Sequence, residues 1–105
     1  MKIRRERQIV FVVNITYTVE LAEIDAHLPA HIQFLQRYYQ QGVFLASGRK
    51  LPRTGGMIFA TAQNQTELEA ILHNDPFYLA GLANYEITEI EVSKTASGLS
   101  QLLTI

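Results

Sequence analysis

The chain has 105 residues, of which 48% are hydrophobic and 18% charged, and its formal net charge is −1; these values are typical of one globular domain. A charge this close to neutral gives no support to nucleic-acid or anionic-membrane binding, which use a basic surplus. The absence of cysteine excludes disulfides, thiol nucleophiles and thiolate metal sites. The apolar run Ile9–Val13 is too short for a secretory signal or a membrane span, so we expect a cytoplasmic protein.

Residues 8–18 predict a first strand, because they are rich in β-branched and aromatic side chains. Both faces of this segment begin apolar, with Phe11 and Val13 on one face and Val10 and Val12 on the other. A strand that is apolar on both faces is usually covered on both. In a protein of this size we expect helices over one face and a second subunit over the other.

A long helix is predicted from Asp25, as its cap, to Gln41, with Gly42 at the position that ends helices. Pro29 then falls in the first turn, where a proline costs least. Two lines of side chains run along this helix at helical spacing. One is an apolar stripe and the other is a line along its flank: Ile24, Leu28, Ile32, Leu35 and Tyr39 form the stripe, and His27, His31, Phe34 and Tyr38 the flank.

Two further strands are predicted at residues 43–50 and 57–63, joined by a loop that proline and glycine indicate at residues 51–56. Strict alternation in the first of these strands places Ser47 on the face opposite to Phe44.

Asn64 is predicted to cap a second helix that ends at Asn74 or Asp75. A fourth strand follows at residues 85–92. Its apolar residues change parity near the centre of the strand, which allows a bulge there.

The order βαββαβ is the split βαβ, ferredoxin-like pattern: an α+β fold with a four-stranded antiparallel sheet and two helices on one face. No repeat or long linker divides the chain, so we expect a single domain, 1–105, with a core at about residues 8–93. We assign no role to the basic extension at residues 1–7. The tail at residues 94–105 ends apolar, and we expect it to dock on a partner subunit.

The segment Asp75-Pro76-Phe77 carries the main candidate for chemistry. Pro76 disfavours a helical Asp75 and can begin a short new helix with Asp75 as its N-cap. A carboxylate held in this way can orient a histidine, and His31 lies in a strongly apolar helical context. From these residues alone, Asp75 is either a helix cap and nothing more, which local physics favours, or a carboxylate that positions His31.

Several motifs together resemble the YCII-related (YciI-like) family of small dimeric α+β barrel proteins. They are Pro29-Ala30-His31 with Leu35, the run from Gly42 to Gly48, Gly55-Gly56-Met57-Ile58, Asp75-Pro76-Phe77 and Ala80-Gly81-Leu82. The likeness runs from roughly residue 9 to residue 92, and its most specific part is the combination of His31 with Asp75-Pro76-Phe77. It implies a ferredoxin-like protomer whose sheet packs on that of a second copy, so that the partner is the chain itself in a homodimer.

The resemblance also implies that His31 and Asp75 meet in a cleft as a catalytic dyad, with Ser47 near its edge. Relatives such as a dehydrochlorinase of a chlorinated hydroquinone, and muconolactone isomerases of the wider fold, suggest proton transfer on small ring compounds. We therefore expect a small cofactor-independent enzyme that uses this dyad for general acid–base catalysis, by isomerisation or elimination. The alternatives are a dimeric module that binds a small molecule or regulates without catalysis, and a purely structural protein.

Residues near the dyad are candidates for binding the substrate. Phe34, Tyr38 and Phe77 could wall a pocket for a small ring, although ordinary core packing is expected for at least half of such aromatic residues. Ser47 could donate a hydrogen bond to a substrate oxygen. Arg49 follows Ser-Gly where the family often has proline; it could bring positive charge to the mouth of the cleft, but we favour a solvated strand end.

Metal binding is weakly indicated. His27 and His31 have the i, i+4 spacing of a helical metal pair, but no acidic residue or cysteine evidently completes a site. Gly55 and Gly56 are expected in the hairpin loop and not in a phosphate cradle, because no helix follows them directly. We therefore predict neither a metal nor a cofactor.

Overall fold

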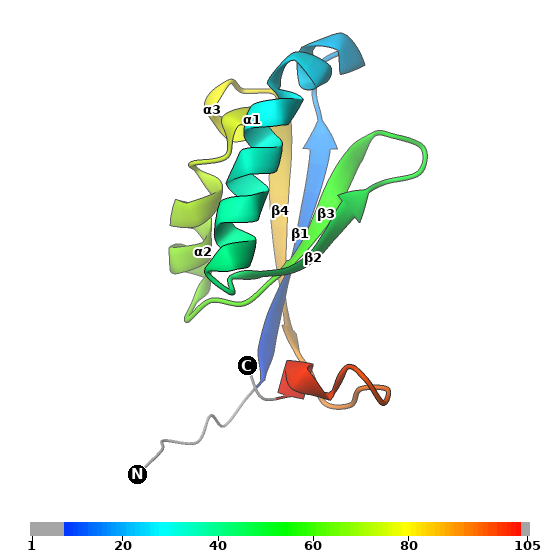
Figure 1. Ribbon diagram of the computed structural model, residues 1–105, viewed down its shortest axis with the longest axis vertical. Coiled ribbons are helices and arrows are strands. Elements are labelled where there is room, and N and C mark those ends of the chain that lie inside the picture. The colour runs from blue at the N-terminus through cyan, green and yellow to red at the C-terminus, as the bar shows by residue number, and fades with distance from the viewer. Residues whose placement is uncertain (1–7, 104–105) are drawn as a thin grey trace.

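The computed structural model describes residues 8–103, so the basic extension and the last two residues of the apolar tail lie outside it. The elements are, in order, β1 (Ile9–Tyr17), α1 (Leu21–Gln40), β2 (Phe44–Arg49), β3 (Gly55–Ala60), α2 (Gln65–Leu72), α3 (Pro76–Leu79), β4 (Ala83–Glu91) and the 3-10 helix η1 (Ser100–Leu103) (Figure 1). The strands form one antiparallel sheet in the order β2-β3-β1-β4, which is the predicted ferredoxin-like arrangement. Among the helices of the described residues, none combines the length and the apolar character that crossing a membrane requires.

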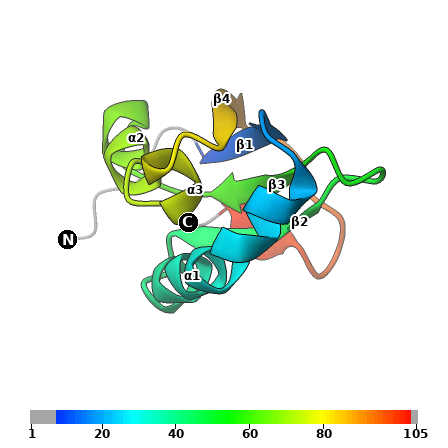
Figure 2. The same ribbon diagram turned by 90° about the horizontal axis from the view of Figure 1, so that it is seen from above.

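The core lies between one face of the sheet and the helices that cover it (Figure 2). Phe11, Val13 and Ile15 of β1 point into this core and are 3% exposed or less. Side chains from both longer helices pack on them: Phe34 and Tyr38 from α1, and Leu68 and Leu72 from α2. The predicted first strand is thus confirmed, and the structure shows that its face with Phe11 and Val13 is the one that the helices cover.

Beyond the first turn of α1, where Ile24 of the stripe is buried, the flank and not the apolar stripe faces into the core. His31, Phe34 and Tyr38 of the flank are buried, whereas Ile32 and Tyr39 of the stripe are 44% and 38% exposed. The two lines are neighbours on the helix surface, so the rotation of the helix against the sheet decides which line is more deeply buried. This rotation brings a histidine into the interior.

Helix α1 begins earlier than predicted, at Leu21, and Asp25 is not its cap. Ile24 in the first turn is fully buried in a small cluster with residues of and after α3, and this packing stabilises a start that has no side-chain cap. Pro29 consequently lies inside the helix instead of in its first turn. The predicted end is confirmed, since Gly42 follows the helix with a φ of 75°.

The predicted caps of the two shorter helices form. The N-cap Asn64 accepts a hydrogen bond at Oδ1 from the Glu67 amide at 2.8 Å. At α3, Asp75 accepts one from the Phe77 amide at 3.0 Å, and Pro76 occupies the first helical position. Helix α2 ends at Leu72, slightly before the predicted end.

A β-bulge in β2 decides which side chains of this strand face α1. The pairing with β3 shifts its register between Phe44 and Ala46, which leaves Leu45 as the extra residue. Ser47 therefore pairs with the buried Ile58 and lies on the helix-covered face together with Phe44, contrary to the strict alternation expected from the sequence. The bulge that the parity change allowed in β4 is not formed, because β4 pairs with β1 without a register shift.

Strand β3 begins with Gly55 and Gly56, which were expected in the hairpin loop. A Cβ atom at Gly55 would lie 1.8 Å from the carbonyl oxygen of Ile15 in β1. Glycine is therefore required where these two strands approach each other most closely. The loop itself spans residues 50–54, between β2 and β3.

The sheet face away from the helices carries an apolar surface. Val10 and Val12 of β1 lie on this face. Beside them, Phe59 of β3 and Ile90 of β4 are each 42% exposed. This is the face on which the sequence predicts a second subunit.

Candidate active site

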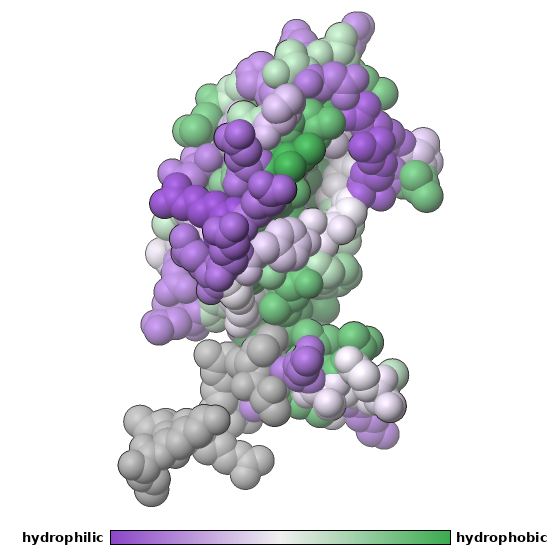
Figure 3. All heavy atoms as spheres, in the orientation of Figure 1, coloured by the Kyte–Doolittle hydropathy of each residue, from purple (hydrophilic) through white to green (hydrophobic). Residues whose placement is uncertain are grey.

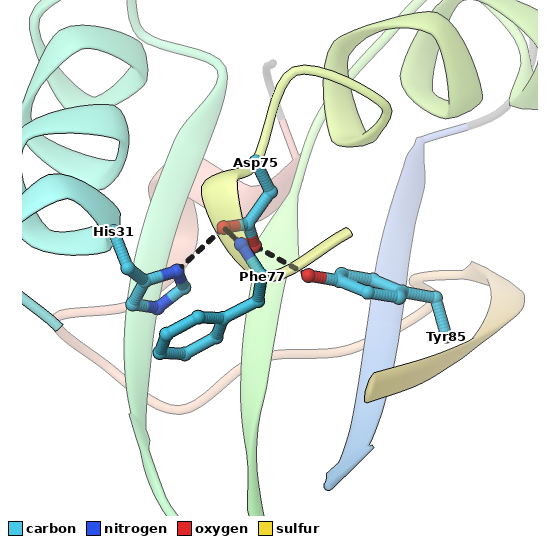
Figure 4. A network of polar contacts seen from close by, with 4 residues as sticks. All are labelled: His31, Asp75, Phe77 and Tyr85. Carbon is cyan, nitrogen blue, oxygen red and sulfur yellow. Dashed lines mark hydrogen bonds and ion pairs between the residues drawn. The ribbon is translucent and has the colours of Figure 1, made fainter. Parts of the chain in front are cut away.

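His31 and Asp75 meet in the interior, as the family resemblance implies. The Nδ1 atom of His31, on α1, lies 2.8 Å from Oδ1 of Asp75, the cap of α3 (Figure 4). His31 is 8% exposed and Asp75 is fully buried. The two residues are 44 positions apart in the chain, so only the packing of α3 against α1 brings them together.

Asp75 accepts three hydrogen bonds from three different segments. Its Oδ1 accepts from His31 Nδ1 and from the Phe77 amide, and its Oδ2 accepts from the Tyr85 hydroxyl at 2.6 Å (Figure 4). An ionised carboxylate can only accept, and charge-assisted bonds of this kind are roughly twice as strong as neutral ones. The carboxylate is therefore held in one orientation while fully buried.

These contacts also determine the tautomer of His31. Because Asp75 accepts, the proton of a neutral imidazole sits on Nδ1 and the lone pair on Nε2. Nε2 has no hydrogen-bond partner among the described residues. His31 is thus oriented as a base whose free nitrogen remains available to another molecule.

The aromatic residues predicted to bind substrate lie in supporting positions. Phe77 stacks on the His31 ring, with the centroids 4.0 Å apart and the planes at 7°. Phe34 and Tyr38 are 7% and 6% exposed and pack on one another and on Phe44 in the core. Phe77 and Phe34 therefore pack on the imidazole, and Tyr38 packs behind Phe34, which fits the core-packing alternative left open for them.

A cavity of about 180 Å³ opens beside His31, between α1 and the β2–β3 hairpin. Its apolar lining includes Leu28, Ile32 and Leu35 from α1 and Ile15 and Ile58 from the sheet. Figure 3 shows apolar surface in this hollow, between the polar outer side of α1 and the polar residues at the hairpin loop. The apolar stripe of α1 is thus accounted for in part as the wall of a cavity.

Ser47 and Arg49 line the same cavity. Ser47 reaches it because of the bulge in β2, and its Oγ shares a hydrogen bond of 2.6 Å with the hydroxyl of Tyr39 on α1. Arg49 is exposed at the end of β2 and has no hydrogen bond or ion pair with the described residues. Both were named from the sequence, and both lie at the cavity, where their role in binding stays a prediction.

Arg53 is a residue of the cavity that sequence reasoning did not single out. It lies in the β2–β3 loop, lines the cavity, and donates from Nη2 to Asp25 Oδ1 on α1 at 2.6 Å. This hydrogen bond lowers the pKa of Asp25 and raises that of Arg53. Asp25 thus anchors the loop instead of capping the helix. A loop arginine whose partner lies 28 positions away leaves no local signal.

Tyr85 was also missed, although a signal existed. It lies near the start of β4 opposite Ile15, on the core-facing side of the strand. A tyrosine on a core-facing position requires a partner for its hydroxyl, and here the partner is Asp75. Burial, and secondly the charge of Asp75, raises the pKa of Tyr85, so the hydroxyl remains a donor.

The described residues contain no group of three or more His, Cys, Asp or Glu side chains placed to hold a metal ion. The ring of His27 is turned to its own helix, where Nδ1 donates to the Glu23 carbonyl at 3.0 Å. His31 uses the same ring atom for Asp75. In both rings Nδ1 has a protein partner, and among the described residues only Nε2 is left without one.

A larger cavity of about 270 Å³ lies between α2, α3 and β4. His73 and Tyr78 line it and stack on each other with ring centroids 4.3 Å apart. His73 has no hydrogen bond to a carboxylate among the described residues. The first cavity is therefore the better candidate, because it contains an oriented histidine.

Comparison with known proteins agrees with the resemblance seen in the motifs. The model of the YCII-related domain matches residues 10–91. A search of curated proteins by sequence gives no match.

Two solved structures are similar in fold. One is 5-chloro-2-hydroxyhydroquinone dehydrochlorinase (TftG) from Burkholderia phenoliruptrix AC1100 in complex with 2,5-dihydroxybenzoquinone, with a TM-score of 0.66 and 18% identity over 85% of this chain and 97% of that one. The other is SnoaB, a cofactor-independent oxygenase from Streptomyces nogalater, with a TM-score of 0.50 and 17% identity over 85% of this chain and 96% of that one. Both are of the dimeric α+β barrel class, which confirms the predicted fold.

Proposed function

This chain belongs to the YCII-related family, and we propose that it is an enzyme that moves a proton on a small ring compound by general acid–base catalysis, without a cofactor. The observation that carries this proposal is the buried pair of His31 Nδ1 and Asp75 Oδ1 at 2.8 Å. It leaves the second ring nitrogen of His31 free at a residue that lines a cavity.

The size of the cavity supports a substrate with a single ring. Its volume is about 180 Å³, and an engineered cavity of about 150 Å³ in another protein is large enough to bind benzene. The apolar lining from Leu28, Ile32 and Leu35 suits the faces of such a ring. Ser47 can donate a hydrogen bond to an oxygen substituent.

The proposed chemistry follows from the tautomer. Nε2 of His31 takes a proton from a carbon or hydroxyl of the substrate, and Asp75 stabilises the resulting imidazolium through Nδ1–H. In an isomerisation, the imidazolium returns the proton to another atom of the same molecule. In an elimination, the electron pair of the broken C–H bond forms a double bond and the leaving group departs with its own bonding pair.

The two similar structures support this class of reaction. One is a dehydrochlorinase with a ring compound bound, and the other is an oxygenase described as cofactor-independent. At 18% and 17% identity they do not define a substrate for this chain. We therefore propose the reaction class and not the compound.

Solvent exchange provides a test that does not require the natural substrate. Small dihydroxy ring compounds and lactones are incubated with the protein in D₂O, and deuterium incorporation at carbon is followed by NMR. We expect the wild type to accelerate exchange in at least one compound. His31→Gln should lower that rate by about 10²- to 10⁴-fold, the usual contribution of a general acid–base group, while the ligand still binds.

The matched control is His73→Gln, because His73 is exposed and lines only the second cavity. This variant should exchange at the wild-type rate. If His31→Gln keeps full exchange activity, the dyad is not the catalyst. If compounds bind and none exchanges, the protein is a binding or regulatory module.

A further inference from the structure

The polar lining of the cavity beside His31 is positively charged. Two of its residues, Arg49 and Arg53, carry guanidinium groups, and no Asp or Glu lines it. Asp25 lies outside the lining and pairs with Arg53. Arg49 forms no ion pair among the described residues, although its charge also acts on Asp25. Two guanidinium groups therefore stand against one carboxylate, and the cavity keeps a positive charge.

Arg53 also has an unused donor. Its Nη2 is occupied by Asp25, but its Nε is buried and has no hydrogen-bond partner in the described part of the chain. A buried donor without a partner costs free energy, and such atoms are rare in folded proteins. Because Arg53 lines the cavity, a turn of its side chain would bring this donor to an oxygen atom of a molecule bound there.

The position of the two arginines is separate from that of the base. Arg49 ends β2 and Arg53 lies in the loop that follows, whereas His31 projects from α1. The hydrogen bond from Arg53 to Asp25 holds the guanidinium in place by tying this loop to α1. A ring between the apolar walls could then have one substituent at the arginines while another of its atoms faces His31.

We propose that this cavity selects anionic ring compounds, whose acidic oxygen, as a carboxylate, phenolate or enolate, is bound by the guanidinium groups of Arg53 and Arg49. The proposal names the substrate class of the proposed enzyme and rests on the assignment of this cavity as its site. Guanidinium groups bind such oxygens through charge-assisted hydrogen bonds. They also stabilise the negative charge that develops on a ring oxygen when His31 removes a proton.

The test compares two ligands of the same shape and different charge. Benzoate and benzamide are titrated into the protein by calorimetry at low salt. We expect the wild type to bind benzoate at least about tenfold more tightly, since hydrogen bonds between charged groups exceed neutral ones by this order. The preference should decrease as salt is added, because exposed Arg49 is screened.

Three variants assign the preference to its residues. Arg53→Gln removes the charge and Nε–H, and should bring the two affinities to within about twofold of each other. Arg49→Gln has no hydrogen bond to lose among the described residues, so it keeps the fold and should lower the preference in part. Arg37→Gln is the matched control: Arg37 is exposed on α1, lies over the Tyr38 ring and does not line the cavity, so the full preference should remain.

Equal affinity of the wild type for the two ligands, or no saturable binding of benzoate, overturns the proposal. A preference that persists in both Arg53→Gln and Arg49→Gln also overturns it. These outcomes are distinct from failure of the catalytic proposal, because His31→Gln should keep the preference for benzoate. If benzoate binds with this preference and no compound exchanges deuterium, the anion site is supported and the catalytic proposal is wrong.

Discussion

Asp75 acts as a helix cap and as the partner of His31 at the same time. One carboxylate accepts the Phe77 amide of α3, the His31 ring of α1 and the Tyr85 hydroxyl of β4. The two roles that the sequence offered as alternatives are therefore compatible in geometry. The rigidity of a cap is what gives the histidine a fixed orientation.

Replacing Tyr85 tests this network at neutral and at alkaline pH. Tyr85→Phe should lower the free energy of unfolding by about 1.5–3 kcal/mol at neutral pH, the usual range for a hydrogen bond to a charged group. Burial and the charge of Asp75 raise the pKa of Tyr85 in the folded protein, whereas an unfolded tyrosine ionises near pH ~10. The stability that Tyr85 contributes is thus present below this pH and lost as the pH rises above it.

The difference in the free energy of urea unfolding between wild type and Tyr85→Phe should accordingly decrease above pH ~10. The control is Tyr78→Phe, because Tyr78 is 42% exposed and its hydroxyl has no hydrogen bond within the described residues. If the difference in unfolding free energy between wild type and Tyr85→Phe stays constant through the alkaline range, the pKa of Tyr85 is not raised.

The candidate residues differ in how far the sequence could reveal them. His31 and Asp75 have local signals, an apolar helical context and a proline-begun helix, and the family motif joins them. Tyr85 and Arg53 act through partners in other elements. No pattern within a few positions of either residue names that partner.

At the scale of the elements, close approach between β1 and β3 gives a sharp prediction. Gly55→Ala should lower the free energy of unfolding by at least about 2 kcal/mol, because the new Cβ would overlap the Ile15 carbonyl and force the strands apart. The control is Gly48→Ala, since a Cβ at Gly48 would meet no atom within 4 Å. Equilibrium urea unfolding of both variants checks this, and equal stabilities would show that the strands can separate at no cost.

The elements themselves were predictable where their signals are local. The strands and helices occur in the expected order, and Asn64 and Asp75 cap their helices. The predicted start of α1 was wrong, because the helix begins at Leu21 without a side-chain cap that the sequence could reveal. The bulge in β2 was also missed, since it exists only through the register with β3.

At the scale of the whole molecule, the uncovered sheet face predicts a homodimer. Apolar side chains such as Val12, Phe59 and Ile90 lie on the face opposite to the helices, and the similar structures are of the dimeric α+β barrel class. Phe59→Lys should abolish the dimer, because the interface would have to bury an unpaired charge. Sedimentation velocity at micromolar concentration measures the change.

Leu79→Lys is the control, because Leu79 is 70% exposed and lies on α3, one of the helices and not part of the open sheet face. It should sediment as the wild type does. A wild type that is monomeric under the same conditions would contradict the homodimer and leave the apolar face of β1 without its proposed cover.

The sequence by itself determined the order of elements, the caps at Asn64 and Asp75, and, through the family motif, the pairing of His31 with Asp75. Each depends on contacts within a few residues or on a motif with fixed spacing. Only the tertiary structure decided that the flank of α1 faces the core, that Ser47 reaches the cavity, and that Arg53 and Tyr85 join the site. These features depend on the rotation of a helix and the register of strands, which are set by side chains distant in the chain.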